Sequence, residues 1–166
     1  LRQCVARQNN FGEHALSSLL YGMAKLNRDW RSLHPDLQTT LKEAIVVCHV
    51  RDIYTATGVS NSLSGLAGMH AYWDDMSSSV QLALVEDVCK IAEELSATQL
   101  VSVIHSLSQM SLSWDDTPAK LQMALLFALS MHASREELNE QHVSTLLYSL
   151  GRMGIRDPAM LGRGAW

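Results

Sequence analysis

Cysteine is scarce in this chain of 166 residues, and the three cysteines, Cys4, Cys48 and Cys89, lie far apart without a Cys-x-x-Cys spacing. A disulfide framework needs paired cysteines and a zinc site needs ligands at short spacings, so neither is indicated. The histidines form no His-x-x-x-His or His-Glu-x-x-His pattern, and we therefore expect no metal ion and no cofactor. This cysteine usage is typical of a reducing compartment.

Residues that interrupt helices are also few, because the chain has only 3 prolines and 9 glycines, and 6% of its residues are aromatic. Leu, Ala, Met, Gln and Glu recur instead, and these residues favour helices. The longest apolar run, Met123 to Leu129, is far shorter than the roughly 20 residues that cross a bilayer. With 47% hydrophobic residues, the sequence predicts an all-α fold with one continuous core over residues 1–166 and no membrane span.

Motifs of catalysis are missing as well. The sequence has no Gly-x-Ser-x-Gly elbow, no phosphate-binding glycine loop and no dinucleotide fingerprint. The acidic pairs Asp74/Asp75 and Asp115/Asp116 suit helix starts, where the helix dipole attracts negative charge, better than they suit catalysis. We therefore expect a protein that is not an enzyme, with no catalytic residue and no small-molecule substrate.

An internal repeat is the strongest feature that the sequence does have. Three tryptophans each lie four residues after a Leu or Met of buried type, in the pairs Leu26/Trp30, Met69/Trp73 and Met110/Trp114, and Met153 continues the series. These four anchors are 43, 41 and 43 residues apart, which is typical of two-helix solenoid units. We interpret the tryptophans as wedges between the two helices of each unit, and the alternative is a set of stacking platforms for nucleic acid bases.

Two helical patterns fill each unit. Before each anchor, apolar residues recur at spacings of four, three and three, as in Leu16, Leu20, Met23 and Leu26, which predicts an amphipathic helix. After each tryptophan, a short polar break leads into a second helical pattern. The sequence therefore predicts an α-solenoid of about four stacked helical hairpins, with units over residues 13–57, 58–96, 97–138 and 139–166, the last one incomplete.

Local signals predict where helices start and where the chain turns. Pro35 suits the first turn of a helix, with His34 before it as the cap. The segments Ser96 to Gln99 and Ser134 to Glu137 match capping boxes, which predicts a helix start at each. Gly58 is expected to reverse the chain at the junction between the first two units.

Each anchor ends a similar short segment: Gly22-Met-Ala-Lys-Leu26, Gly65-Leu-Ala-Gly-Met69, Ser106-Leu-Ser-Gln-Met110 and Ser149-Leu-Gly-Arg-Met153. Over roughly residues 13–157, these segments resemble the alanine-leucine-alanine-lysine-leucine-glycine heart of the first helix in heptatricopeptide and octotricopeptide repeat proteins. The resemblance implies an organellar protein, of the mitochondrion before the plastid, that is associated with RNA or belongs to a mitochondrial ribosome. A purely structural subunit of a respiratory or photosynthetic complex is the alternative.

A column of polar residues along the exposed side of the first helices is the candidate binding surface. Spacings of three and four place its members on one helix face, and stacked units would align them into a ribbon for single-stranded or ribosomal RNA or for a protein partner. The alternative is an ordinary solvated face. The net charge of −4 argues against attraction of nucleic acid to the whole surface but leaves a local basic patch open. The candidate residues are Tyr21, Lys25, Asn61, Ser64, His105, Gln109, Tyr148 and Arg152.

Both ends of the repeat array are expected to be open. Residues 1–12 occupy the place where a preceding helix would finish, and the fourth unit lacks a second helical pattern. Leu147, Leu150 and Met153 would then lack the helix that covers their equivalents. The sequence therefore predicts that further repeats or a protein partner cover the ends.

Overall fold

The computed structural model describes residues 12–155, so the helix end expected within residues 1–12 lies almost entirely outside the described residues. Across the described range there are seven α-helices, two short 3₁₀ helices and no strand, which confirms the predicted all-α fold. The α-helices are α2 (Glu13–Lys25), α3 (Pro35–Val50), α4 (Ala56–Gly68), α5 (Ser78–Ile91), α6 (Ala97–Gln109), α7 (Ala119–Ser134) and α8 (Glu140–Arg152), and the 3₁₀ helices are η2 (Trp30–Ser32) and η3 (Trp73–Asp75).

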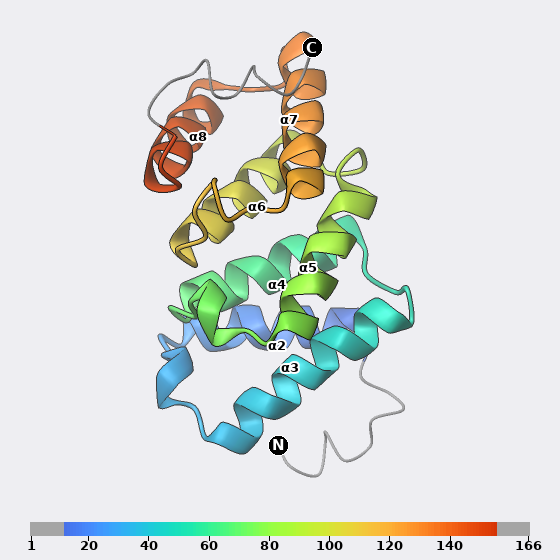
Figure 1. Cartoon of the computed structure of the whole chain (residues 1–166), viewed down its shortest axis with the longest axis vertical. Helices are drawn as coiled ribbons and strands as arrows, with labels where there is room; N and C mark the ends of the chain where they lie inside the picture. The colour runs from blue at the N-terminus through green and yellow to red at the C-terminus, as the bar shows by residue number, and fades with distance from the viewer. Residues whose placement is uncertain (1–11, 156–166) are drawn as a thin grey trace.

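The helices alternate between two rows along the molecule (Figure 1). The A helices, α2, α4, α6 and α8, pack each against the next and form the A row. The B helices, α3, α5 and α7, do the same and form the B row. Each B helix also packs against the A helix that precedes it in the chain. None of the described helices is long and apolar enough to cross a membrane.

Capping side chains start two of the helices as predicted. The His34 side chain accepts a hydrogen bond from the Asp36 amide at the start of α3, and Pro35 occupies the first turn. Ser96 and Gln99 form the predicted capping box at the start of α6. These local contacts satisfy amide groups that have no partner within the first turn of a helix.

Two predictions of helix starts and turns are wrong. Ser134 is the last residue of α7, because the apolar pattern of that helix continues up to it, and α8 starts instead after Asn139. The Asn139 side chain accepts the amide of His142 and so caps α8. Gly58 lies inside α4, where it packs against α2, and the cap of that helix is Thr55.

Each tryptophan turn is joined to the following unit by the same main-chain hydrogen bond, in which the tryptophan N–H donates to the carbonyl of the next anchor. A glutamine eight residues after each tryptophan donates its side-chain amide to the tryptophan carbonyl. All three indoles are buried, which fits wedges between helices rather than platforms for bases. The donor and acceptor pairs are Trp30 and Met69, Trp73 and Met110, and Trp114 and Met153, at N···O distances of 2.7, 2.7 and 2.8 Å.

The anchors share a backbone conformation but differ in burial. Each one caps an A helix, and the residue after it has a positive φ between 51° and 92°. Met69, Met110 and Met153 are buried, whereas Leu26 is 73% exposed, so the expected burial of Leu26 is wrong. The physical reason is the neighbour: a tryptophan turn of the preceding unit covers each methionine, and no described unit precedes Leu26.

The last A helix differs from its equivalents in a similar way. Leu147 is 67% exposed, as expected for a side chain that has lost its cover. Leu150 and Met153 are buried, and the expectation that they would lack a partner is wrong. Their side chains belong to the main apolar core, and the Met153 carbonyl accepts the N–H of Trp114.

Small residues bring the first two A helices into close contact. A Cβ atom on Gly65 would lie 2.7 Å from the Cβ of Leu20 and 2.8 Å from the nitrogen of Tyr21. A Cβ atom on Gly68 would lie 2.8 Å from the Cβ of Ala24. These distances are shorter than van der Waals contact, so α2 and α4 can cross this closely only because the two residues are glycines.

Charged side chains join the B helices. His49 of α3 lies 2.8 Å from Asp87 and 3.3 Å from Glu86 of α5, and Glu86 lies 3.0 Å from Lys120 of α7. Asp87 is only 4% exposed, and its second carboxylate oxygen has no hydrogen-bond partner among the described residues. Burial raises the pKa of Asp87. An open pocket of about 370 Å³ lies at the surface between α3 and α5.

Candidate functional site

The predicted polar column lies on the A helices, but its members differ in exposure. The half-buried members lie on helices α4 and α6, which have a neighbour on both sides in the A row. Part of the column is therefore a contact between helices, and only its exposed members are free to meet a ligand. Tyr21, Lys25, Gln109, Tyr148 and Arg152 are exposed, whereas Asn61, Ser64 and His105 are half-buried.

The half-buried members are used in hydrogen bonds between units. The hydroxyl of Ser64 on α4 lies 2.9 Å from that of Ser102 on α6. The Nδ1 atom of His105 on α6 lies 3.0 Å from the hydroxyl of Ser149 on α8. Both contacts cross from one unit to the next, so these residues hold the A row together.

His105 is a neutral link in a longer chain of hydrogen bonds. Burial lowers the pKa of His105, and the positive charge of Arg152 lowers it further. In the neutral ring, Nε2 accepts the Gln109 amide at 2.9 Å, and Nδ1 therefore donates to Ser149. The Ser149 hydroxyl in turn donates to the carbonyl of Thr145 at 2.7 Å. The chain orients the side chain of Gln109, which is exposed.

The first and the last A helix each carry a cation beside an aromatic ring. The ammonium group of Lys25 lies 5.1 Å from the ring centre of Tyr21. The guanidinium group of Arg152 lies 6.0 Å from the ring centre of Tyr148, and its Nη1 donates to the Tyr148 hydroxyl at 3.4 Å. These pairs place positive charge at the exposed ends of the polar column.

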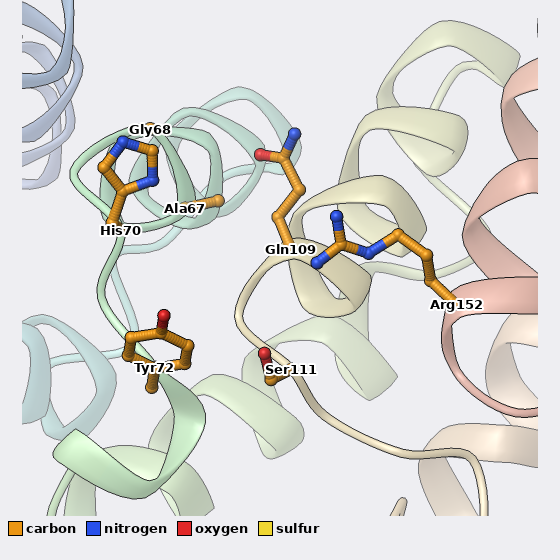
Figure 2. A pocket seen from close by; sticks show the side chains of 7 residues that line it. All are labelled: Ala67, Gly68, His70, Tyr72, Gln109, Ser111 and Arg152. Carbon is orange, nitrogen blue, oxygen red and sulfur yellow. The ribbon is translucent and has the colours of Figure 1, made fainter.

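A pocket of about 370 Å³, here named the A-helix pocket, opens where α4, α6 and α8 end (Figure 2). Figure 2 shows the ring of His70, the amide of Gln109 and the guanidinium of Arg152 around one opening, with the hydroxyls of Tyr72 and Ser111 on another side. Two members of the predicted column, Gln109 and Arg152, therefore meet here. The pocket is lined by Ala67, Gly68, His70, Tyr72, Gln109, Ser111 and Arg152.

The ends of the A helices create this pocket. Met69 and Met110 cap α4 and α6, and the next residues, His70 and Ser111, have φ values of 56° and 63°. This left-handed conformation ends a helix and turns the chain sharply. The carbonyl end of a helix carries partial negative charge, which complements the guanidinium of Arg152.

Tyr72 is positioned by the preceding unit. The guanidinium of Arg31 lies 4.6 Å from the ring centre of Tyr72 and 3.4 Å from the carboxylate of Asp75. The same carboxylate accepts the main-chain N–H of Tyr72 at 3.1 Å. One face of the ring is therefore covered by a cation, while the hydroxyl points toward the pocket (Figure 2).

Sequence reasoning missed His70, Tyr72 and Ser111 as pocket residues, because it considered only one face of the helices. The sequence did contain a signal for them, because His70 and Ser111 directly follow the anchors Met69 and Met110. Tyr72 lies three residues after Met69. Residues at a fixed place after each anchor fall at the same edge of the stack.

The described residues offer little for covalent or metal chemistry. Within residues 12–155, no three His, Cys, Asp or Glu side chains gather in a way that could hold a metal ion. Cys48 is a buried free thiol, and burial raises its pKa to about 11, which keeps it protonated at neutral pH. Comparisons with protein-family models and with curated proteins find no match to this chain.

Proposed function

We propose that this chain is an α-solenoid binding protein of the heptatricopeptide and octotricopeptide type, which holds single-stranded RNA and catalyses no reaction. The repeated hydrogen bond from a tryptophan to the next anchor supports the solenoid, because one kind of contact joins each unit to the next. The two rows of helices support it as well. The organellar setting, with a mitochondrial ribosome as the first candidate, belongs to the same proposal through the family resemblance.

The single observation that carries RNA binding is the A-helix pocket. Gln109 can donate to and accept from the edge of a base, and Arg152 can bind a phosphate. Tyr72 and Ser111 add hydroxyl groups for a ribose or a base. Since three successive units contribute side chains, a strand that crosses the A row would contact more than one unit at this place.

Filter binding with a short labelled single-stranded RNA at low salt tests this proposal. Arg152→Gln is expected to weaken binding roughly tenfold and to reduce the salt dependence by about one counterion. Arg135→Gln is the matched control, because Arg135 is an exposed arginine at the end of α7 and its loss changes the net charge equally. Undetectable affinity of the unaltered chain, or equal losses in both variants, would contradict RNA binding in the pocket.

A second function, that of a structural subunit in a respiratory or photosynthetic complex, is favoured by exposed apolar side chains at one end of the array. Leu147 and Val143 of α8 and Phe127 of α7 are exposed. Apolar residues that gather on a surface mark contacts with other proteins. Purification from the native source with a constant set of proteins and without RNA would favour this function over RNA binding.

A further inference from the structure

The last A helix repeats the sequence of the first. When α2 and α8 are aligned at their anchors, both begin with a glutamate, Glu13 or Glu140, and both end with a basic residue. Both also carry Leu-Leu-Tyr at the centre, over residues 19–21 and 146–148. The two helices therefore share the first glutamate and the central Leu-Leu-Tyr at equivalent positions, whereas Leu16 and Ala24 of α2 correspond to Val143 and Gly151 of α8.

In the first unit, α4 covers this face. The carboxylate of Glu13 accepts the hydroxyl of Thr55 at 3.0 Å, just before the start of α4. Gly65 crosses Leu20 and Tyr21 so closely that a Cβ atom there would lie 2.6 Å from the carbonyl carbon of Leu20. Leu20 is fully buried as a result.

In α8 no described residue provides such a cover. Leu147, the equivalent of Leu20, is the exposed side chain described above, and Tyr148 and Glu140 are exposed beside it. Phe127 of α7 is also exposed. Its equivalent in the preceding unit is Glu86 of α5, which pairs with Lys120 of the following unit. The surface is thus apolar at its centre and acidic at one end.

We propose that the face of α8 formed by Glu140, Val143, Leu147 and Tyr148 binds a helix of a partner protein that has a glycine or another small residue where it crosses Leu147 and Tyr148. This inference rests on the second candidate function and names the chemistry of the partner. The contact of α2 with α4 defines that chemistry, because α8 has the same glutamate, leucine and tyrosine that meet α4 in the first unit.

The partner helix therefore resembles α4 in two respects. It carries a small residue at the place of Gly65, because a larger side chain there would overlap the backbone of the facing helix at Leu147 and Tyr148, the equivalents of Leu20 and Tyr21. It has a hydroxyl residue before its first turn, where Thr55 donates to a glutamate. The α4 helix of a second copy is not free to bind this face, because it is already packed between α2 and α6.

A synthetic helix with the sequence of residues 55–70 is the probe for this surface. A lactam bridge between positions 63 and 67, on the side of the helix away from the contact, keeps it helical, which circular dichroism verifies before use. Fluorescence anisotropy is expected to show saturable binding to the whole chain. Leu147→Glu in the chain, or Gly65→Leu in the probe, is expected to weaken binding by at least about tenfold, through charge at an apolar contact or through overlap.

Leu82→Glu is the matched control in the chain, because Leu82 is also an exposed leucine, lies on α5 and is outside the proposed face. It should leave probe binding unchanged. Failure of the helical probe to bind, or equal binding of the Gly65→Leu probe, would overturn the proposal. A dimer of the chain that Leu147→Glu dissociates would assign the face to a second copy and would overturn it too.

Two further measurements distinguish a failure of this inference from a failure of either proposed function. Leu147→Glu should retain RNA binding in the filter assay, since none of the four residues of this face lines the A-helix pocket. Partner proteins that still purify with Leu147→Glu would leave the structural-subunit function standing while refuting this surface.

Discussion

The A row and the B row differ in the residues that join one helix to the next. Between α2 and α4, glycines at positions 65 and 68 allow backbone and small side chains to touch. Between α3 and α5, a histidine and a buried carboxylate meet, and a pocket of about 370 Å³ remains. The contact of α2 with α4 therefore depends on the volume of single residues, whereas the contact of α3 with α5 depends on charge.

Repeat positions sharpen this contrast. Asp87 of α5 stands where the first and third units have Ala44 and Ala128, at equal distances after their tryptophans. Ala128 is fully buried, and Asp87 is only 4% exposed. The B row thus accommodates a buried charge at a place where its other helices have a methyl group, and His49 is the residue that partners it.

The largest effect is expected from overpacking the A row. Gly65→Leu forces a side chain into the backbone of Leu20 and should lower the free energy of unfolding by about 3 kcal/mol. Urea denaturation followed by circular dichroism measures this loss. Gly22→Ala is the control in the same row: its Cβ meets nothing within 4 Å, so the change should be neutral or stabilising by up to about 1 kcal/mol. Similar losses in both variants would contradict tight packing at Gly65.

Removal of one partner in the B row is expected to have a smaller effect. His49→Ala leaves the buried carboxylate of Asp87 without its hydrogen-bond partner and should cost about 2 kcal/mol of unfolding free energy. Thermal unfolding measures the loss. In an Asp87→Ala background the same histidine substitution should cost much less, and equal costs in the two backgrounds would refute the pairing.

Replacement of the buried carboxylate itself should stabilise the protein. Asp87→Ala restores the residue of the other units and removes a carboxylate whose ionised form is disfavoured by burial, so it is expected to stabilise the protein at neutral pH. Because burial raises the pKa of Asp87 above 3.8 in the folded state, the folded chain binds this proton more tightly than the unfolded chain. The native protein should therefore lose stability relative to Asp87→Ala as pH rises from about 4 toward neutral. A difference that stays constant across this range, measured by denaturation at several pH values, would argue against a perturbed carboxyl group.

The smallest effect is expected at the exposed edge of the B row. Lys90 and Asp52 form an ion pair in which both side chains are mostly exposed to solvent. Solvent and salt weaken such a pair, so Lys90→Ala should change the free energy of unfolding by less than about 0.5 kcal/mol. A loss as large as that of His49→Ala would show that exposed charges contribute as much as the buried contact.

The helical fold could be predicted because periodicity is local information. Apolar spacing before each anchor and the tryptophan turns place the helices, and the Ser96 cap needed only three neighbouring residues. The exposure of Leu26 could not be predicted, since it depends on a unit elsewhere in the stack rather than on its own surroundings in the sequence. Leu20 is buried and Leu147 is exposed although both lie in a Leu-Leu-Tyr triplet, and this difference too depends on whether a neighbouring unit covers the residue.

The candidate site was only partly within reach of sequence reasoning. Gln109 and Arg152 share a helix face with the rest of the column, so spacing found them. His70 and Ser111 enter the pocket because left-handed residues turn the chain after each anchor, and a helix-face argument stops before that turn. The column also included Ser64 and His105, whose hydroxyl and ring are used between units and are not free for a ligand.

Disulfide trapping across the A row tests most directly whether successive units stack in this register. The hydroxyl oxygens of Ser64 and Ser102 lie 2.9 Å apart, so cysteines at both positions are expected to form a disulfide bond. In a variant that lacks the natural cysteines, the Ser64→Cys/Ser102→Cys pair should cross-link within one chain under mild oxidation and keep the native unfolding temperature. A control pair, Ser64→Cys with Ser130→Cys on the exposed side of α7, should not. Failure of the first pair to cross-link in a folded chain, or equal cross-linking of both pairs, would contradict the stacking of α4 on α6.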